Sequence, residues 1–175
     1  HPTLRRQRQM CIRDSPCGYG LPSVVGAKIG RPDVPVVGFS GDGAFGIAVN
    51  ELTAIGREEW PAVTQIVFRN YQWGAEKRNS TLWYDDNFVG TELDTQVSYA
   101  GIAKACGLQG VIAKTMDELT EALHTAIKDQ MENGKTTLIE AMINQELGEP
   151  FRRDAMKKPV AVAGVSASDM REQVV

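Results

Sequence analysis

Short apolar runs alternate with longer stretches of helical spacing along most of the chain. The runs are bounded by Gly, Pro or Asp and are short enough to be strands buried on both faces. They predict strands over 34–39, 63–68, 110–113 and 137–143, with helices over 21–30, 46–57, 98–106 and 116–131. Because strand and helix alternate, the sequence predicts an α/β fold, a parallel sheet with helices on both faces.

Two of the remaining patterns carry a further expectation. In 46–57, the spacing of Ile47, Leu52 and Ile55 predicts one buried helix face. Residues 71–97 match neither period and are predicted to be one long irregular segment. Loops of that length are uncommon in compact domains unless they are functional, so this segment is expected to serve a site.

The ends of the chain do not share the alternation. Residues 1–15 are basic and have no period, so they are predicted to be a non-native or disordered segment. Residues 16–145 are predicted to form one folded domain. Residues 146–175 are charged at first and then rich in Ala, Val and Ser, and they are predicted to be an extended C-terminal extension.

Composition narrows the function classes. The 175 residues are 42% hydrophobic and 23% charged, as in soluble globular proteins. The net charge of −3 indicates no basic face for nucleic acid, and no apolar stretch approaches the roughly 20 residues of a membrane span. The scattered Cys11, Cys17 and Cys106 have no metal-like spacing and indicate the reduced thiols of a cytoplasmic protein.

Polar residues follow two of the predicted strands, at the point where each strand ends. Gly41-Asp42-Gly43 follows the first of them, and Asn70 follows the second. If these strands are parallel neighbours, Asp42 and Asn70 meet at the edge where open α/β sheets bind ligands. Mg²⁺ prefers oxygen ligands, and Asp42, Asn70 and the main-chain carbonyl of Gln72 can supply them.

The glycines around Asp42 suit the approach of a diphosphate. Gly41, Gly43 and Gly46 let the backbone come close to it, and a helix beginning near Gly46 would point its positive end at the phosphates. The diphosphate would supply the further oxygens and the negative charge that a magnesium ion needs beside one carboxylate. The sequence therefore predicts a magnesium–diphosphate site.

Two other interpretations fit part of the pattern. Residues 41–46 match G-x-G-x-x-G, the dinucleotide fingerprint, between a strand and a helix. That fingerprint needs an acid at the end of the next strand, which here ends in Arg69-Asn70, and Asp42 would repel a pyrophosphate without a cation between them. A glycine-rich turn without a ligand leaves Asn70 unexplained. Both are less favoured than the magnesium site.

These residues resemble the motif of the thiamine-diphosphate-dependent enzyme superfamily, in its C-terminal, diphosphate-binding domain. Segment 17–22 (CGYGLP) also resembles the glycine-rich helix entry before that motif. Within the superfamily, 70–77 (NYQWGAEK) and 146–155 (ELGEPFRRDA) resemble the sulfoacetaldehyde acetyltransferases, and the resemblance covers 17–159. It implies that residues 16–145 are a domain that binds thiamine diphosphate and Mg²⁺.

The resemblance implies roles for single residues. Asp42, Asn70 and the Gln72 carbonyl would be the metal ligands. Contacts to the cofactor would come from Gly18, Tyr19, Gly41, Gly43, Ala44, Phe45, Asn70, Gly74 and Ala75. Arg69 departs from the motif, which commonly has a second asparagine there, and the change is expected to alter the local loop but to leave metal binding intact.

The implied reaction converts sulfoacetaldehyde and phosphate into acetyl phosphate and sulfite. Both substrates are anions, and the cations expected to hold them are Lys77, Arg78, Arg152 and Arg153. The superfamily implies a homodimer or homotetramer, with no nucleic-acid or membrane partner.

The resemblance also implies that the glutamate which activates the cofactor belongs to an earlier domain. Neither Glu51 nor Glu76 is given that role, so no catalytic residue is assigned. The upstream domains would be missing partners, and this chain alone is expected to be inactive. The alternatives are another thiamine-diphosphate enzyme, such as an acetolactate synthase or an acetyl-phosphate-forming oxidase, and a cofactor-binding module without catalysis.

Overall fold

The computed structural model describes residues 17–147, 161–162 and 165–166. They fall into two units, one with residues 17–72 and 92–145 and the other with residues 73–91 and the described residues from 146 onward. The segment 1–15 lies outside the described residues, and its assignment as non-native or disordered stays a prediction, as do the predicted domain limits.

The first unit is built on a four-stranded parallel sheet. Its strands are β1 (Val37–Gly41), β2 (Thr64–Arg69), β3 (Gln109–Ala113) and β4 (Thr137–Met142), in the spatial order β1-β2-β4-β3. The register pairs Gly41 with Phe68 and Val67 with Glu140, so the carboxyl ends of β1 and β2 lie together. The predicted parallel sheet is confirmed.

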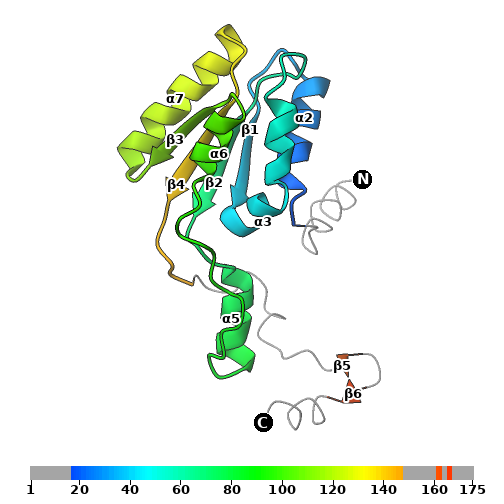
Figure 1. Cartoon of the computed structure of the whole chain (residues 1–175), viewed down its shortest axis with the longest axis vertical. Helices are drawn as coiled ribbons and strands as arrows, with labels where there is room; N and C mark the ends of the chain where they lie inside the picture. Colours follow the sequence, from blue (N-terminus) through cyan, green and yellow to red (C-terminus); the bar gives the residue numbers. More distant parts are fainter. Residues whose placement is uncertain (1–16, 148–160, 163–164, 167–175) are drawn as a thin grey trace, which may run out of the picture. The chain divides into compact units, whose positions relative to one another are not determined.

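Helices cover both faces of this sheet, as predicted (Figure 1). One face packs against α2 (Gly20–Gly30), α3 (Asp42–Ile47), α4 (Leu52–Ile55) and α6 (Tyr99–Ala105), and the other packs against α7 (Met116–Glu132). Successive strand residues point to opposite faces, so Val67 joins the first core while Ile66 joins the second.

The boundaries of α7 follow from its capping residues. Thr115 caps the start by accepting a hydrogen bond from the Glu118 amide at 3.2 Å, and the Glu118 carboxylate accepts one from the Lys114 amide at 2.6 Å. Past the other end, Gly134 takes φ 62°, a left-handed conformation that favours glycine. The predicted helix 116–131 is confirmed, with one further residue.

The single helix predicted over 46–57 is wrong. The chain instead forms α3, the 3-10 turn η2 (Val49–Glu51) and α4 in succession. α3 begins at Asp42 rather than near Gly46, because the extended Gly41 ends β1 and flanks the first helical turn directly. The amino terminus of this helix therefore lies at the Gly-Asp-Gly sequence itself.

The buried face predicted for that helix is wrong at one residue. Leu52 and Ile55 are buried, whereas Ile47 is 55% exposed. Ala48 lies between them with φ −108° and ψ 14°, outside the helical region, so the helical period does not continue from Ile47 to Leu52.

The second unit contains a helix where the sequence predicted irregular structure. α5 (Gly74–Trp83) occupies part of the segment 71–97. Its Ala, Glu, Lys and Arg residues are good helix formers, but none of its residues is buried, so no apolar period marks it. The unit also contains the antiparallel pair β5 (Ala161–Val162) and β6 (Val165–Ser166).

Within the described ranges, no helix has both the length and the apolar character needed to cross a membrane. Cys17 and Cys106 are free thiols, as expected, and Cys11 lies outside the described residues.

Candidate cofactor and metal site

The carboxyl ends of β1 and β2 bring the predicted metal ligands together. Asp42 is the first residue of α3 and is only 2% exposed. Asn70 follows β2 directly, and its main-chain amide lies 3.1 Å from Asp42 Oδ2. The sequence prediction that an acid and an amide meet at this edge of the sheet is confirmed.

Hydrogen bonds fix the Asp42 carboxylate from two sides. Its Oδ2 accepts bonds from the amides of Asn70 at 3.1 Å and Tyr71 at 2.6 Å and from Arg69 Nη1 at 3.3 Å, while Oδ1 accepts one from the Gly43 amide at 2.9 Å. Tyr71 takes φ 60°, and this left-handed turn lets two successive amides point at one oxygen. Oδ2 is therefore fully engaged, and Oδ1 has room for a further partner.

Two oxygens, Asp42 Oδ1 and the Gln72 carbonyl oxygen, converge on the Asn70 side-chain amide. One terminal atom of the Asn70 side-chain amide lies 3.2 Å from both Asp42 Oδ1 and the Gln72 carbonyl oxygen, and the Asn70 oxygen accepts a hydrogen bond from the Gln72 amide at 3.3 Å. With oxygen at that position, three oxygens face each other without a proton between them, the arrangement of ligands around a cation. With nitrogen there, the amide would donate to both oxygens. The donor set fits Mg²⁺, whose neighbouring ligands lie about 3.0 Å apart when metal–oxygen distances are about 2.1 Å.

The glycine before Asp42 lies against open space. Apart from its chain neighbours, no atom of the described residues lies within 4 Å of a Cβ built on Gly41, and its φ of −74° suits any residue. By contrast, a Cβ on Gly46 would lie 2.6 Å from the Tyr99 hydroxyl. Packing of this chain thus requires glycine at position 46, while position 41 has room for a ligand beside the backbone.

Arg69 is a site residue whose position the sequence analysis missed. Its side chain is 1% exposed and lies 3.3 Å from Asp42 Oδ2 and 3.8 Å from Glu140 Oε1. The guanidinium lies over the rings of Tyr71 and Tyr99, 4.2 Å and 4.8 Å from their centroids. Arg69 therefore forms a buried ion pair with the proposed metal ligand, while the expected change in the local loop stays a prediction.

Glu140 is the second missed residue, and it connects the site to α6. Its carboxylate accepts hydrogen bonds from the Ser98 hydroxyl at 2.8 Å and from the amides of Tyr99 and Ala100 at 2.9 Å and 3.0 Å. A glutamate inside the apolar strand 137–143, and an arginine at the end of 63–68, were the available signals. Opposite charges in adjacent buried strands indicate a buried pair.

Comparison with known proteins decides the class of this site. Residues 4–141 match the family described as thiamine pyrophosphate enzyme, C-terminal TPP binding domain. The chain belongs to this family. A sulfoacetaldehyde acetyltransferase of Roseovarius nubinhibens is 86% identical over 160 residues, which are 91% of this chain and 26% of that protein. Another, of Rhodobacter capsulatus, is 78% identical over 90% of this chain and 27% of that protein.

Solved structures of thiamine enzymes share the fold. A thiamine diphosphate-dependent 4-hydroxybenzoylformate decarboxylase of Rhodococcus jostii RHA1 has a TM-score of 0.64 and 27% identity, covering 75% of this chain and 24% of that chain. The resemblance to the thiamine-diphosphate superfamily and its α/β fold is confirmed, and the dinucleotide interpretation is set aside. The chain spans about a quarter of the length of these relatives, and the family match begins within the segment 1–15.

Gly41 lies against open space whereas Gly46 packs against Tyr99, so alanine substitutions at these two positions separate cofactor binding from folding. The test uses the chimera, in which this chain replaces the matching part of the Roseovarius nubinhibens relative. We expect Gly41→Ala to leave the melting temperature within about 2 °C, because nothing in the chain lies near the added methyl. It should weaken thiamine diphosphate binding about tenfold or more, measured by calorimetric titration with Mg²⁺ present. Gly46→Ala should lower the melting temperature instead, because its methyl meets Tyr99. Equal losses of affinity without any loss of stability in both variants would contradict this assignment.

The other residues with predicted cofactor contacts are distributed over both units. Gly18 takes φ 95° and lies close to Ile47. A Cβ built on Gly18 would lie 3.0 Å from the Ile47 side chain. Tyr19 flanks the start of α2 and is exposed. Ala44 and Phe45 belong to the first turns of α3, and Phe45 is buried against the Tyr99 ring. None of these positions tests the predicted contacts, which stay predictions.

The predicted residues after position 72 belong to the second unit. Gly74 and Ala75 begin α5, and in the sequence they follow the proposed ligand Gln72 closely. In the same unit, Lys77 Nζ lies 5.4 Å from the Phe88 ring centre, and Arg78 Nη2 donates to the Leu147 carbonyl at 3.4 Å. Arg152 and Arg153, the two remaining anion-binding candidates, lie outside the described residues.

Tyr99 ties the carboxyl end of β1 to α6. Its hydroxyl donates to the Asp42 carbonyl at 3.0 Å, and its ring packs edge-on against Phe45. Burial raises the pKa of the Tyr99 phenol; the Arg69 charge opposes this shift, and the Asp42 and Glu140 charges add to it. The phenol therefore stays a donor at ordinary pH.

This shift predicts a loss of stability at alkaline pH. Because the folded state holds the Tyr99 proton more tightly, the stability it contributes is complete below the ordinary phenol pKa of about 10. It is lost as pH rises through the raised folded-state pKa. Melting temperatures of the chimera between about pH 8 and pH 11 should fall less steeply in Tyr99→Phe than in the exposed-tyrosine control Tyr84→Phe. Identical slopes in the two variants would contradict the assignment.

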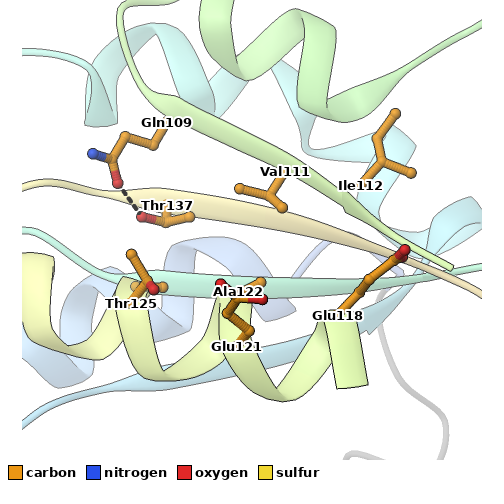
Figure 2. A pocket seen from close by; sticks show the side chains of 9 residues that line it. Gln109, Val111, Ile112, Glu118, Glu121, Ala122, Thr125 and Thr137 are labelled. Carbon is orange, nitrogen blue, oxygen red and sulfur yellow. Dashed lines mark hydrogen bonds between the residues drawn. The ribbon is translucent and has the colours of Figure 1, made fainter. Parts of the chain in front are cut away.

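A hollow of 310 Å³ lies elsewhere in the first unit, between β3 and α7. Figure 2 shows Gln109 and Val111 of β3 facing Glu118, Ala122 and Thr125 of α7. Some of its polar groups have partners within the chain: Thr137 donates to Gln109 at 2.7 Å, and Glu118 accepts from Lys114. The hollow contains none of the predicted site residues. Among the described residues, no group of three or more His, Cys, Asp or Glu is placed to hold a metal, so the candidate site depends on Asn70 and a carbonyl besides one carboxylate.

Proposed function

We propose that this chain binds the diphosphate of thiamine diphosphate through Mg²⁺, as the C-terminal part of a sulfoacetaldehyde acetyltransferase. The metal ligands are Asp42 Oδ1, the Asn70 side-chain oxygen and the Gln72 carbonyl. The observation that carries the proposal is that Asp42 Oδ1 and the Gln72 carbonyl oxygen both lie 3.2 Å from one terminal atom of the Asn70 side-chain amide, in a chain that belongs to the thiamine pyrophosphate family. The acetyltransferase assignment is supported by the 86% identity to the Roseovarius relative.

The backbone after β1 is the part that approaches the phosphates. Gly41 leaves open space beside the chain, and Asp42, Gly43 and Ala44 form the first turn of α3, whose amides have no partner inside the helix except through capping. The Asp42 carboxylate occupies one of them, the Gly43 amide, and turns Oδ1 toward the metal position. This chain therefore orients the cofactor through one carboxylate and a close approach of backbone.

Thiamine diphosphate supplies the carbanion chemistry of the acyl transfer, and the protein supplies binding and electrostatics. The reaction proposed is sulfoacetaldehyde plus phosphate to acetyl phosphate plus sulfite. The sulfonate and the phosphate are anions, and Lys77, Arg78, Arg152 and Arg153 are the proposed residues that hold them.

The proposed enzyme needs domains that precede this one. The superfamily resemblance places the glutamate that activates the cofactor in an upstream domain, and implies a cytoplasmic homodimer or homotetramer. The isolated chain should therefore show no turnover, while the chimera should be active. Activity of the isolated chain would contradict the two-domain site.

Product analysis of the chimera tests the reaction. Sulfoacetaldehyde, phosphate, thiamine diphosphate and Mg²⁺ should give sulfite and acetyl phosphate in equal amounts, and sulfite release should stop when phosphate is left out. Substitution of this chain by the original Roseovarius sequence is the matched control. Turnover of pyruvate to acetolactate, without sulfite release, would keep the cofactor and overturn the substrate.

A further inference from the structure

Arg69 is a buried charge that the proposed ligand set does not use. It ends β2 at 1% exposure, between the carboxylates of Asp42 and Glu140. A charged side chain so fully removed from water is stable only when its partners are well placed, and removal of one partner is costly. Because Arg69 lies next to the carboxylate of the proposed metal ligand Asp42, its function is expected in the metal site.

Direct binding of a phosphate or sulfonate is not that function. Guanidinium groups suit oxyanions, but Arg69 Nη2 already donates to the carbonyls of Asp94 at 2.8 Å and Val97 at 2.9 Å, while Nη1 faces Asp42. The faces of the guanidinium lie against Tyr71 and Tyr99. Nε has no hydrogen-bond partner among the described residues, but it is buried and lies 3.8 Å from Glu140 Oε1, a carboxylate oxygen that would repel an incoming anion.

The charge balance of the metal site indicates a different role. Asp42 is the one carboxylate among the proposed ligands, and Arg69 neutralises it from the Oδ2 side. Asn70 and the Gln72 carbonyl add no net charge. The Glu140 carboxylate is the other nearby anion, and its oxygens already accept three hydrogen bonds at the start of α6. Arg69 reduces the summed charge of the Asp42 and Glu140 carboxylates from −2 to −1, so a divalent cation arriving alone is attracted less strongly, in a buried site where Coulomb interactions are strong.

We propose that Arg69 is a positioning residue that offsets the charge of Asp42, so that the site binds a divalent cation weakly until an anionic diphosphate adds its own charge. The same contact holds Oδ2 and leaves Oδ1 for the metal. This inference rests on the proposed function, because it concerns the metal site named there. It explains why an arginine stands where the superfamily motif commonly has an uncharged asparagine.

Manganese binding to the chimera, followed by electron paramagnetic resonance, measures this coupling without any turnover. With Mn²⁺ as the probe, unsubstituted chimera should bind the metal at least about 100-fold more tightly when thiamine diphosphate is present. Arg69→Met should tighten binding in the absence of thiamine diphosphate about tenfold or more, because the Asp42 charge is no longer neutralised. Arg69→Lys keeps the charge and should behave as the unsubstituted protein.

A second pair of variants separates this role from a structural one. Arg69→Met with Glu140→Gln removes both charges of the buried pair, keeps an acceptor for the α6 amides, and should still gain metal affinity. Adding Asp42→Asn should remove the gain. A gain that survives Asp42→Asn, an equal gain in Arg69→Lys, or no gain in either methionine variant would overturn the inference alone. Absence of Mn²⁺ binding even with thiamine diphosphate would overturn the proposed function as well.

Discussion

Asp42→Asn is expected to leave the protein folded and to lower the activity of the chimera at least about 100-fold. Changes outside the ligand shell of a metal already cost about 10- to 100-fold, so loss of the one charged ligand should cost more. The fold should survive because the new amide oxygen can take the position of Oδ2, where it meets the amides of Asn70 and Tyr71 and the Arg69 guanidinium. The amide nitrogen then takes the position of Oδ1, where it loses the hydrogen bond from the Gly43 amide and cannot act as a metal ligand.

Steady-state rates with sulfoacetaldehyde, together with melting temperatures, test this prediction. Asp33→Asn is the matched control, because Asp33 is an exposed aspartate of the same unit whose partner is Arg31. The control should keep its rate and should not respond to excess Mg²⁺. If Asp42→Asn retained activity within about threefold of the unsubstituted chimera, Asp42 would not be a metal ligand.

Glu140→Ala is expected to cause the largest loss of stability of any single change in the site. The substitution removes the acceptor of three hydrogen bonds and one of the two carboxylates that face Arg69. Breaking a buried pair in this way costs about 3–5 kcal/mol, because the remaining charge stays buried. The melting temperature of the chimera should fall, and hydrogen exchange of the α6 amides of Tyr99 and Ala100 should become fast.

Two further variants locate the effect. Glu140→Gln keeps an oxygen for the α6 amides and should lose less protection than Glu140→Ala. Glu132→Ala removes an exposed glutamate of α7 whose Lys128 partner lies 4.0 Å away, and it should change stability by less than about 0.5 kcal/mol. Unchanged exchange of the α6 peptide in Glu140→Ala would show that this carboxylate does not hold the helix.

The sheet and the meeting of Asp42 and Asn70 at its edge could be predicted because each depends on a local pattern. Apolar runs bounded by turn residues mark strands, and the strand ends carry Asp42 and Asn70. Once the strands are parallel neighbours, the geometry of the sheet brings the two side chains together without further information. The family resemblance then supplied the cofactor, which no spacing alone could have distinguished from other diphosphates.

The missed features depend on tertiary contacts. Arg69 and Glu140 carry charges inside apolar strands, and their pairing with each other is set by the register of β2 against β4. Helix α5 has no buried residue, so its sequence lacks the apolar period by which an amphipathic helix is predicted. The phase break at Ala48, which exposes Ile47, is likewise a matter of backbone conformation rather than of residue type.

The most direct test of the account is the position of the metal itself. Crystals of the chimera grown with thiamine diphosphate and Mn²⁺ would show the ion by its anomalous diffraction. One peak is expected beside the diphosphate, at about 2.0–2.2 Å from Asp42 Oδ1, the Asn70 side-chain oxygen and the Gln72 carbonyl. A peak that lies out of reach of Asp42, or an Asn70 amide that turns its nitrogen toward the ion, would contradict it.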